Sequence, residues 1–295
     1  MLLEQIIVGV GAGAMYALLA VAVVLIYTGT RTLSICMGEI GAFAFFTSSR
    51  WRENGMPIID WKPSALAAGL IAIVIGAVIA LALERVVMRS LVPRPPLDGL
   101  IATLGIALAL ALLELKIFGI NGQPVRSPVG DRVVSIAGAD LVAPRVAALL
   151  LAVVVAVGLY LFLTRTKFGL ATRAAVSDAT VARLLGVRVN QVYMFAWGAG
   201  GALSALAVAL IAPAFGNSIF PFDQTNFELR ALAGAVIGGL DSLWGAIVGS
   251  LLVGIVEQVV QGYWGSGEAA GAVLLLVLGT LLVRPRGLLG ATGAA

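Results

Sequence analysis

Long runs of apolar residues make up most of this chain, and polar residues gather in the short stretches between them. Runs of membrane length cover residues 5–27, 64–84, 99–118, 144–163, 191–212 and 269–283. About 20 apolar residues are needed to cross a bilayer as a helix. The runs do not alternate between apolar and polar positions as the strands of a membrane barrel do. The pattern therefore predicts transmembrane helices over these ranges.

Two further segments are apolar but interrupted. Residues 33–49 form a shorter run that is broken at Gly38 and Glu39. Residues 228–262 are too long for one span and contain "GGLDSLWG" at 238–245. A Gly-rich break marks a turn, so this segment either crosses twice or dips in and returns. The expected fold is all-α: a polytopic transmembrane helical bundle of about 8 membrane segments, including a broken or re-entrant Gly-rich pair.

Composition supports a membrane protein and leaves little room for a soluble domain. The chain is 60% apolar and 12% charged, whereas about a quarter of the residues of a soluble domain are charged. The N-terminal stretch "MLLEQIIVGV" lacks the basic start of a signal peptide, so we expect a retained first span. We therefore expect a single transmembrane domain over residues 1–295. Residues 119–143 should form an ordered loop or hairpin outside the membrane.

The polar segment 164–190 sets the predicted topology, because Lys and Arg in short loops favour the cytoplasmic side. Placing this segment in the cytoplasm and alternating sides along the chain puts the N-terminus outside and the C-terminus inside. The 19 Lys and Arg residues then divide into 11 inside and 8 outside. The alternation of sides follows directly from the spans, and the cation bias chooses which side is cytoplasmic.

Residues that carry catalysis are scarce. The chain has no histidine, Cys36 is its only cysteine, and no G-x-x-x-x-G-K-[ST] motif occurs. An internal disulfide is excluded, and a nucleotide-binding P-loop cannot be built. We expect no catalytic residue, no metal site, no cofactor and no nucleic-acid partner. If transport consumes ATP, another subunit must hydrolyse it.

Small and acidic residues inside the spans have competing interpretations. "GVGAGAMY" at 9–16 lies in an apolar span, so Gly9 and Gly13 predict close helix packing rather than dinucleotide binding. Glu39 either faces a polar cavity or is structural near the interface. Asp241 is expected in a turn, and Glu257 is expected to face the bundle interior.

The segment "TRTKFGLATRAAVSDATVARLLGV" at 164–187 predicts a short helix with defined ends. Ser177 and Asp178 are good N-cap residues, and Gly186 is a good residue to follow the C-terminus. An apolar patch lies between them, formed by Val181, Leu184 and Leu185. The helix either lies on lipid headgroups or docks a cytoplasmic partner. Composition alone does not separate these interpretations.

The wider stretch "RTKFGLATRAAVSDATVARLLGVRVNQV" resembles the cytoplasmic loop of LivH-like permease subunits of ABC importers for branched-chain amino acids. The positions that match in order are Arg165, Thr166, Lys167, Gly169, Arg173, Ala174, Asp178, Ala182, Leu185 and Gly186. Other stretches agree in the same order, including "ERVVMRSL", "ALAGAVIGGLDSLWGAIVGSLLVGIVE" and "VRPRGLLG". The resemblance therefore covers nearly the whole chain.

This resemblance implies a permease subunit of an ATP-driven importer in a bacterial plasma (inner) membrane, and not an enzyme. It implies as partners ATPase subunits that bind ATP and Mg²⁺, a second and often non-identical permease, an extracytoplasmic substrate-binding protein, and membrane lipid. The substrate would be a branched-chain amino acid or a related small polar or acidic solute. The residues implied to couple the permease to the ATPases are Arg173, Asp178, Ala182, Arg183, Leu185 and Gly186.

The same resemblance implies a translocation path at the start of the second span, and here the chain departs from the family. The family pattern there is N-F-A-[HQ]-G-[DE], and this chain reads "SICMGE". Gly38 and Glu39 match, whereas Ser34 and Met37 replace more polar residues. This predicts a less polar substrate or a smaller share in recognition. The alternative function is an ion-coupled secondary carrier or channel that uses Glu39 and works without ATPases.

Overall fold

The computed structural model describes residues 2–55, 62–91, 95–120, 123–124, 133–136, 139–214, 218–219 and 223–290. The helices are α1 (Leu2–Thr30), α2 (Met37–Asn54), α3 (Ala65–Leu83), a π-helical turn (Glu84–Met88), α4 (Arg89–Leu91), α5 (Pro96–Phe118), α6 (Ala143–Arg165), α7 (Lys167–Ser177), α8 (Ala179–Leu184), α9 (Val189–Ala214), α10 (Asp223–Gly238), α11 (Leu243–Tyr263) and α12 (Ser266–Val283). Short antiparallel pairs join β1 (Gln123–Pro124) to β4 (Ser218–Ile219) and β2 (Val133–Ile136) to β3 (Ala139–Val142).

Seven helices in the described part of the chain are long and apolar enough to cross a membrane. The predicted all-α polytopic bundle is confirmed. The Gly-rich segment 228–262 forms two helices, α10 and α11, separated at residues 239–242, so the predicted break is also confirmed. The β2–β3 pair provides the hairpin expected within residues 119–143.

The second membrane segment starts later than the apolar run suggests. The helix α2 begins at Met37 rather than at residue 33. Arg31 has a φ of 55°, a left-handed conformation that few residues other than glycine adopt, and it ends α1. The chain then runs without helix through residues 32–36. The sequence predicts an interruption of this segment at Gly38. In the structure the interruption comes before Met37, where α2 begins.

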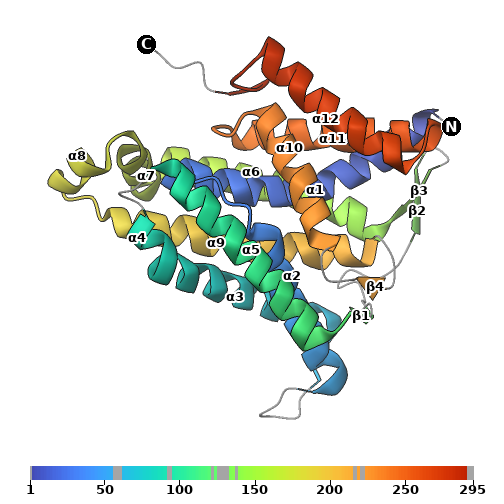
Figure 1. Cartoon of the computed structure of the whole chain (residues 1–295), viewed down its shortest axis with the longest axis horizontal. Helices are drawn as coiled ribbons and strands as arrows, with labels where there is room; N and C mark the ends of the chain where they lie inside the picture. Colours follow the sequence, from blue (N-terminus) through green and yellow to red (C-terminus); the bar gives the residue numbers. More distant parts are fainter. Residues whose placement is uncertain are drawn as a thin grey trace.

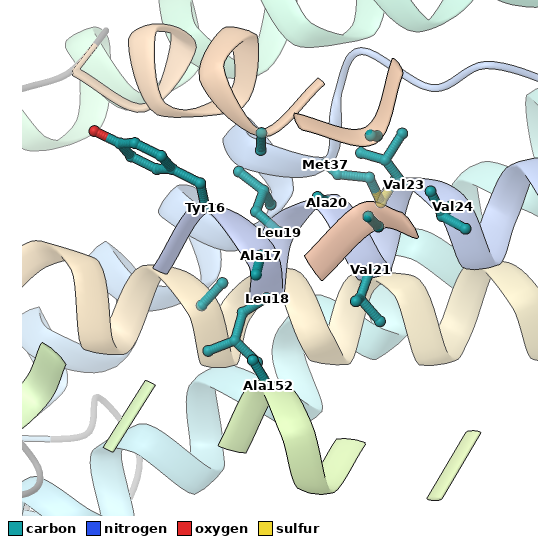
Figure 2. Close-up of a cluster of buried hydrophobic side chains, with 14 of the residues drawn as sticks. Tyr16, Ala17, Leu18, Leu19, Ala20, Val21, Val23, Val24, Met37 and Ala152 are labelled. Carbon is teal, nitrogen blue, oxygen red and sulfur yellow. The ribbon is translucent and has the colours of Figure 1, made fainter. Parts of the chain in front are cut away.

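The centre of the bundle is α1, which is surrounded by other helices. Its residues 12–26 are all buried, and α1 contacts α6, α9, α10 and α11. Figure 2 shows Leu18 of α1 beside Ala152 of α6, while Val23 and Met37 lie together on another side. A helix that is apolar all round and buried all round is what such a central position requires.

Glycines bring α1 very close to α11. A Cβ atom added at Gly9 would lie 2.7 Å from the Cα of Ile255, and one added at Gly13 would lie 2.7 Å from the Cα of Leu251. A larger residue at either position would collide with backbone rather than with a movable side chain. The predicted packing role of Gly9 and Gly13 is confirmed.

The outer helices present apolar side chains to their surroundings. On α3 an exposed row follows the helical repeat of four residues, formed by Leu66, Leu70, Val74 and Val78. Such a row would be costly in water, whereas a bilayer solvates it. The outer surface of the bundle is therefore the surface of a membrane protein.

The two ends of the bundle differ. Figure 1 shows the N-terminus and the β2–β3 hairpin at one end and α7 and α8 at the other, which we call the α8 end. The turn between α10 and α11 lies at the α8 end of α1, because Asp241 Oδ1 is 2.5 Å from Nη1 of Arg31. The final residues join it there: Leu288 and Leu289 donate backbone hydrogen bonds to the carbonyls of Ile237 and Gly238, at 2.8 and 2.9 Å.

Candidate functional site

The short helix α8 is defined at both ends by local hydrogen bonds. The Asp178 side chain accepts from the backbone N–H groups of Thr180 and Val181, at 2.8 and 3.0 Å. Gly186 has a φ of 85°, and its N–H donates to the Arg183 carbonyl. This is the N-cap and glycine stop that the residue types predict. The expected two-turn helix is confirmed.

The exposed side of α8 is apolar. Leu184 is 83% exposed and Leu185 is 77% exposed, and Val181 lies beside them. We call these three residues the α8 tip. Figure 1 shows α8 projecting beyond the other helices at its end of the molecule. Two neighbouring leucines exposed on a short capped helix form an apolar surface of the kind that marks an interaction site.

Ala182, which the resemblance implies as a coupling residue, lies on the opposite side of α8 from this exposed tip. Ala182 is only 1% exposed and belongs to a cluster with Ala175, Val189 and Val192. The small alanine lets this side of α8 pack closely against α9. Leu185 is exposed, as expected for the apolar patch, whereas Ala182 packs α8 against α9.

Part of the loop segment lies beside an open cleft. Arg173 and Ser177 of α7 line one side, and Asp241 of the α10–α11 turn and Trp244 at the start of α11 line the other. The cleft has a volume of about 720 Å³. Arg183 is exposed on α8 and does not line it. The loop segment therefore faces the broken helical pair directly, with space between the two.

The residues predicted to line a path lie together at the start of α2, but they are buried. Ser34, Met37, Gly38 and Glu39 are all inside the packed core. The Met37 N–H donates to Glu228 Oε1 at 2.9 Å, and the Met37 carbonyl accepts from the Ser204 hydroxyl. In this conformation they form a junction of α2, α9 and α10. Their proposed role in the path stays a prediction.

Polar contacts reach Glu39 from α10. The Thr225 hydroxyl donates to Glu39 Oε1 at 2.6 Å, whereas Glu39 Oε2 is buried without a hydrogen-bond partner among the described residues. Glu39 is therefore partly satisfied inside the bundle. A hydrogen bond from a neighbouring helix agrees with the structural interpretation of Glu39, and its role in a path stays a prediction.

Two buried acids escaped the sequence analysis. These are Glu114 and Glu228, which are both buried in the bundle. Glu114 is 0% exposed, and within the described chain neither of its carboxyl oxygens has a hydrogen-bond partner. Both residues lie within apolar runs of the sequence, and this pattern could have indicated that they are buried in the membrane part. Glu228 acts as a distant cap for the first N–H group of α2.

Glu257 faces the bundle interior, as expected. It accepts a hydrogen bond from the Tyr16 hydroxyl at 2.9 Å, and its other oxygen lies 2.5 Å from Arg230 Nε. Neither Tyr16 nor Arg230 was singled out from the sequence. An arginine beside an apolar run and opposite an intramembrane acid was the signal that could have paired them.

Comparison with known proteins agrees with this architecture. A family model described as "Branched-chain amino acid transport system / permease component" matches residues 5–283. The high-affinity branched-chain amino acid transport system permease protein BraD of Pseudomonas aeruginosa is 28% identical, over 98% of this chain and 95% of its own. The corresponding LivH of Escherichia coli is also 28% identical over the same shares.

A more distant likeness is partial. The autoinducer 2 import system permease protein LsrC of Yersinia enterocolitica is 33% identical over 41% of this chain and 36% of its own. No solved structure matches the chain. The family match spans every described membrane helix, from α1 to α12. The chain therefore belongs to the family of permease components of branched-chain amino acid transport systems.

Proposed function

We propose that this permease carries a branched-chain amino acid or a related small polar solute, and that the α8 tip is where ATPase subunits act on it. The observation that carries the proposal is the exposure of Leu184 and Leu185 on a capped helix at one end of the bundle. The names of BraD and LivH support the substrate class. The chain has no P-loop, so the ATP would be hydrolysed on separate subunits.

The cleft between α7 and the α10–α11 turn supports a route for the motion. A push on the α8 tip would move α7, because α7 and α8 are joined at Asp178. The cleft gives α7 space to move toward Asp241 and Trp244. Closing and opening this space would tilt the broken helical pair. Rigid movement of packed helices of this kind is a common way to switch between two states.

The orientation and the remaining partners belong to the same proposal. The α8 end would be cytoplasmic and the N-terminal end would face outward, where a substrate-binding protein would dock. A second permease, homologous or identical, would complete the membrane part. Arg173, Asp178, Arg183 and Gly186 would shape and orient the coupling segment, and Ala182 would hold it against α9.

The test is a reconstituted complex with ATPase subunits and a substrate-binding protein. In the double variant Leu184→Asp plus Leu185→Asp we expect ATPase association to weaken at least about tenfold, or ~1.4 kcal/mol, because charge replaces two apolar side chains that the ATPase would bury. The matched control is Leu289→Asp, a half-exposed leucine in the C-terminal segment at the same end. Membrane insertion should be unchanged in both.

Two results would contradict the proposal. One is full ATPase association and ATP-driven uptake in the double variant, which would move the coupling site elsewhere. The other is uptake by this chain alone, driven by an ion gradient and abolished by Glu39→Gln. That second result would establish the ion-coupled carrier instead.

A further inference from the structure

A second cleft, lined by polar side chains, opens between α1, α10 and α11. Its volume is about 350 Å³, which falls in the range of sites for small molecules. We call it the polar cleft; it is lined by Tyr16, Asn226, Phe227, Arg230, Glu257, Gln258 and Gln261. It is separate from the cleft beside α7, which is formed at the other end of the α10–α11 pair.

The polar cleft lies at membrane depth. Tyr16 is the midpoint of α1, about 21 Å from either end at 1.5 Å per residue. Glu257 lies six residues before the end of α11, about 9 Å by the same measure. Figure 2 shows the buried Tyr16 side chain pointing away from Leu18, on another side of α1. The cleft is therefore reached from the membrane-spanning part of the bundle, nearer the N-terminal end.

A charged pair forms one wall of the cleft. Glu257 receives Arg230 Nε at 2.5 Å and the Tyr16 hydroxyl at 2.9 Å. Glu257 and Tyr16 are buried, whereas Arg230 is partly exposed. Among the described residues Arg230 bonds only through Nε, so its two terminal nitrogens are available. A carboxylate has about four lone-pair sites, so Glu257 still has room for another donor.

The cleft also has polar walls formed by amide side chains, and a purely structural ion pair would not need them. Gln258 and Gln261 hydrogen-bond to each other at 3.3 Å and lie at the surface of α11, beside Asn226 of α10. At 1.5 Å per residue Gln258 lies about 7.5 Å from the end of α11, where an amide that faced lipid would be costly, whereas Gln261 and Asn226 lie nearer the helix ends. Here they border a cleft that also holds an arginine and a glutamate.

We propose that the polar cleft is a transit site for a small zwitterion, whose carboxylate is held by the terminal nitrogens of Arg230 and whose ammonium group is held by Glu257. Arginine suits the first role because its planar fork matches a carboxylate. The amides of Gln258 and Gln261 complete the polar wall, and Phe227 contacts the apolar part of the solute. Opposite charges side by side select a molecule that carries both.

Helices α10 and α11 then connect this site to the α8 end, where the ATPase subunits are proposed to act. The α10–α11 turn faces α7, and the same two helices carry Arg230 and Glu257 toward the other end. A tilt of the pair would change the distance between the two charges, or the access to them. This inference rests on the proposed function, because it assigns the solute to a site within the same importer.

The first test measures access and protection by cysteine labelling of the reconstituted complex. Gln258→Cys, in a Cys36→Ser background, should react with a water-soluble maleimide, whereas the lipid-facing control Leu275→Cys should not. At about ten times its dissociation constant, L-leucine should slow the reaction about tenfold. 4-Methylpentanoate, which has only the carboxylate, and 3-methylbutylamine, which has only the ammonium group, should protect much less.

The second test measures leucine moved per ATP hydrolysed. Gln258→Leu should lower this ratio while ATPase stimulation by the binding protein remains, and Gln191→Leu, an exposed glutamine at the start of α9, should leave it unchanged. If Gln258→Cys is as unreactive as the control, or if all three solutes protect equally, the zwitterion site is wrong. Failure of the proposed function looks different: wild-type complex would then lack ATP-driven leucine uptake.

Discussion

At the scale of single residues, small side chains set the distances in this protein. Gly13 of α1 and Gly254 of α11 lie backbone to backbone, and Gly9 does the same one turn away. Glycine is costly inside a helix in water, where it loses about 0.5–1 kcal/mol relative to alanine. In a bilayer the close approach that it permits is a main source of helix association. The cost of these glycines is therefore offset by packing.

Gly13→Ala is expected to destabilise the bundle. The added methyl group would lie 2.7 Å from the Leu251 Cα, which cannot move without shifting α11. Overpacking of this kind costs about 1–3 kcal/mol. The measurement is the thermal unfolding midpoint of the protein in lipid nanodiscs.

Gly158→Ala is the matched control, because nothing lies within 4 Å of a Cβ atom at that position of α6. It should be neutral or stabilising by about 0.5–1 kcal/mol, since alanine is the better helix former. Equal effects of the two substitutions would show that the α1–α11 contact is looser than described.

At the scale of elements, α8 depends on one side chain for its N-terminal end. A helix of this length has little intrinsic stability, because nucleation is costly and few hydrogen bonds follow it. The Asp178 carboxylate satisfies two of its free N–H groups. The exposed tip therefore keeps its shape through the cap and through Ala182 on the inner side.

Asp178→Ala is expected to loosen α8 by about 1 kcal/mol, because no acceptor replaces the carboxylate. Asp178→Asn should retain most of the cap. The measurement is hydrogen exchange of residues 179–185, together with ATPase stimulation in the reconstituted complex. Ser177→Ala is the control, since Ser177 accepts neither of these bonds. Unchanged exchange in Asp178→Ala would mean that packing alone holds the helix.

The elements also show how far the sequence could lead. Asp178 and Gly186 act on neighbours within a few residues, so their roles were predictable from residue type. Glu228 caps α2 from 191 residues away, and Tyr16 meets Glu257 across 241 residues. Such contacts depend on the path of the whole chain, which local periodicity does not contain. The inward side of Ala182 was missed for the same reason, because α9 decides which face of α8 packs.

At the scale of the whole molecule, the ends of the bundle carry different structures. The α8 end holds α7, the α10–α11 turn and the C-terminal segment, and the N-terminal end holds the short strands. The asymmetry supports the proposed orientation, in which force arrives at one end and solute at the other. The ion pair of Arg31 and Asp241 is exposed, so it contributes little to the stability of the contact between α1 and the α10–α11 turn.

The orientation is tested by cysteine labelling from either side of the membrane. Lys167→Cys should react with an impermeant maleimide only from the cytoplasm, and Asn54→Cys, at the end of α2, only from outside. Cys36 is buried and should give no signal in the unsubstituted chain. Labelling of both variants from the same side would overturn the predicted topology.

The close packing of α1 on α11 also has a consequence for the order of synthesis. The first helix enters the membrane early, yet its partner at Glu257 is made 241 residues later. At about 5–20 residues per second, this interval is about 12–48 s. During this interval the face of α1 that carries Gly9 and Gly13 lies in the bilayer without its contact to α11. The core of this permease is therefore closed only near the end of translation, and a ribosome that stalls before α11 leaves the central helix α1 without the partner for its glycine face.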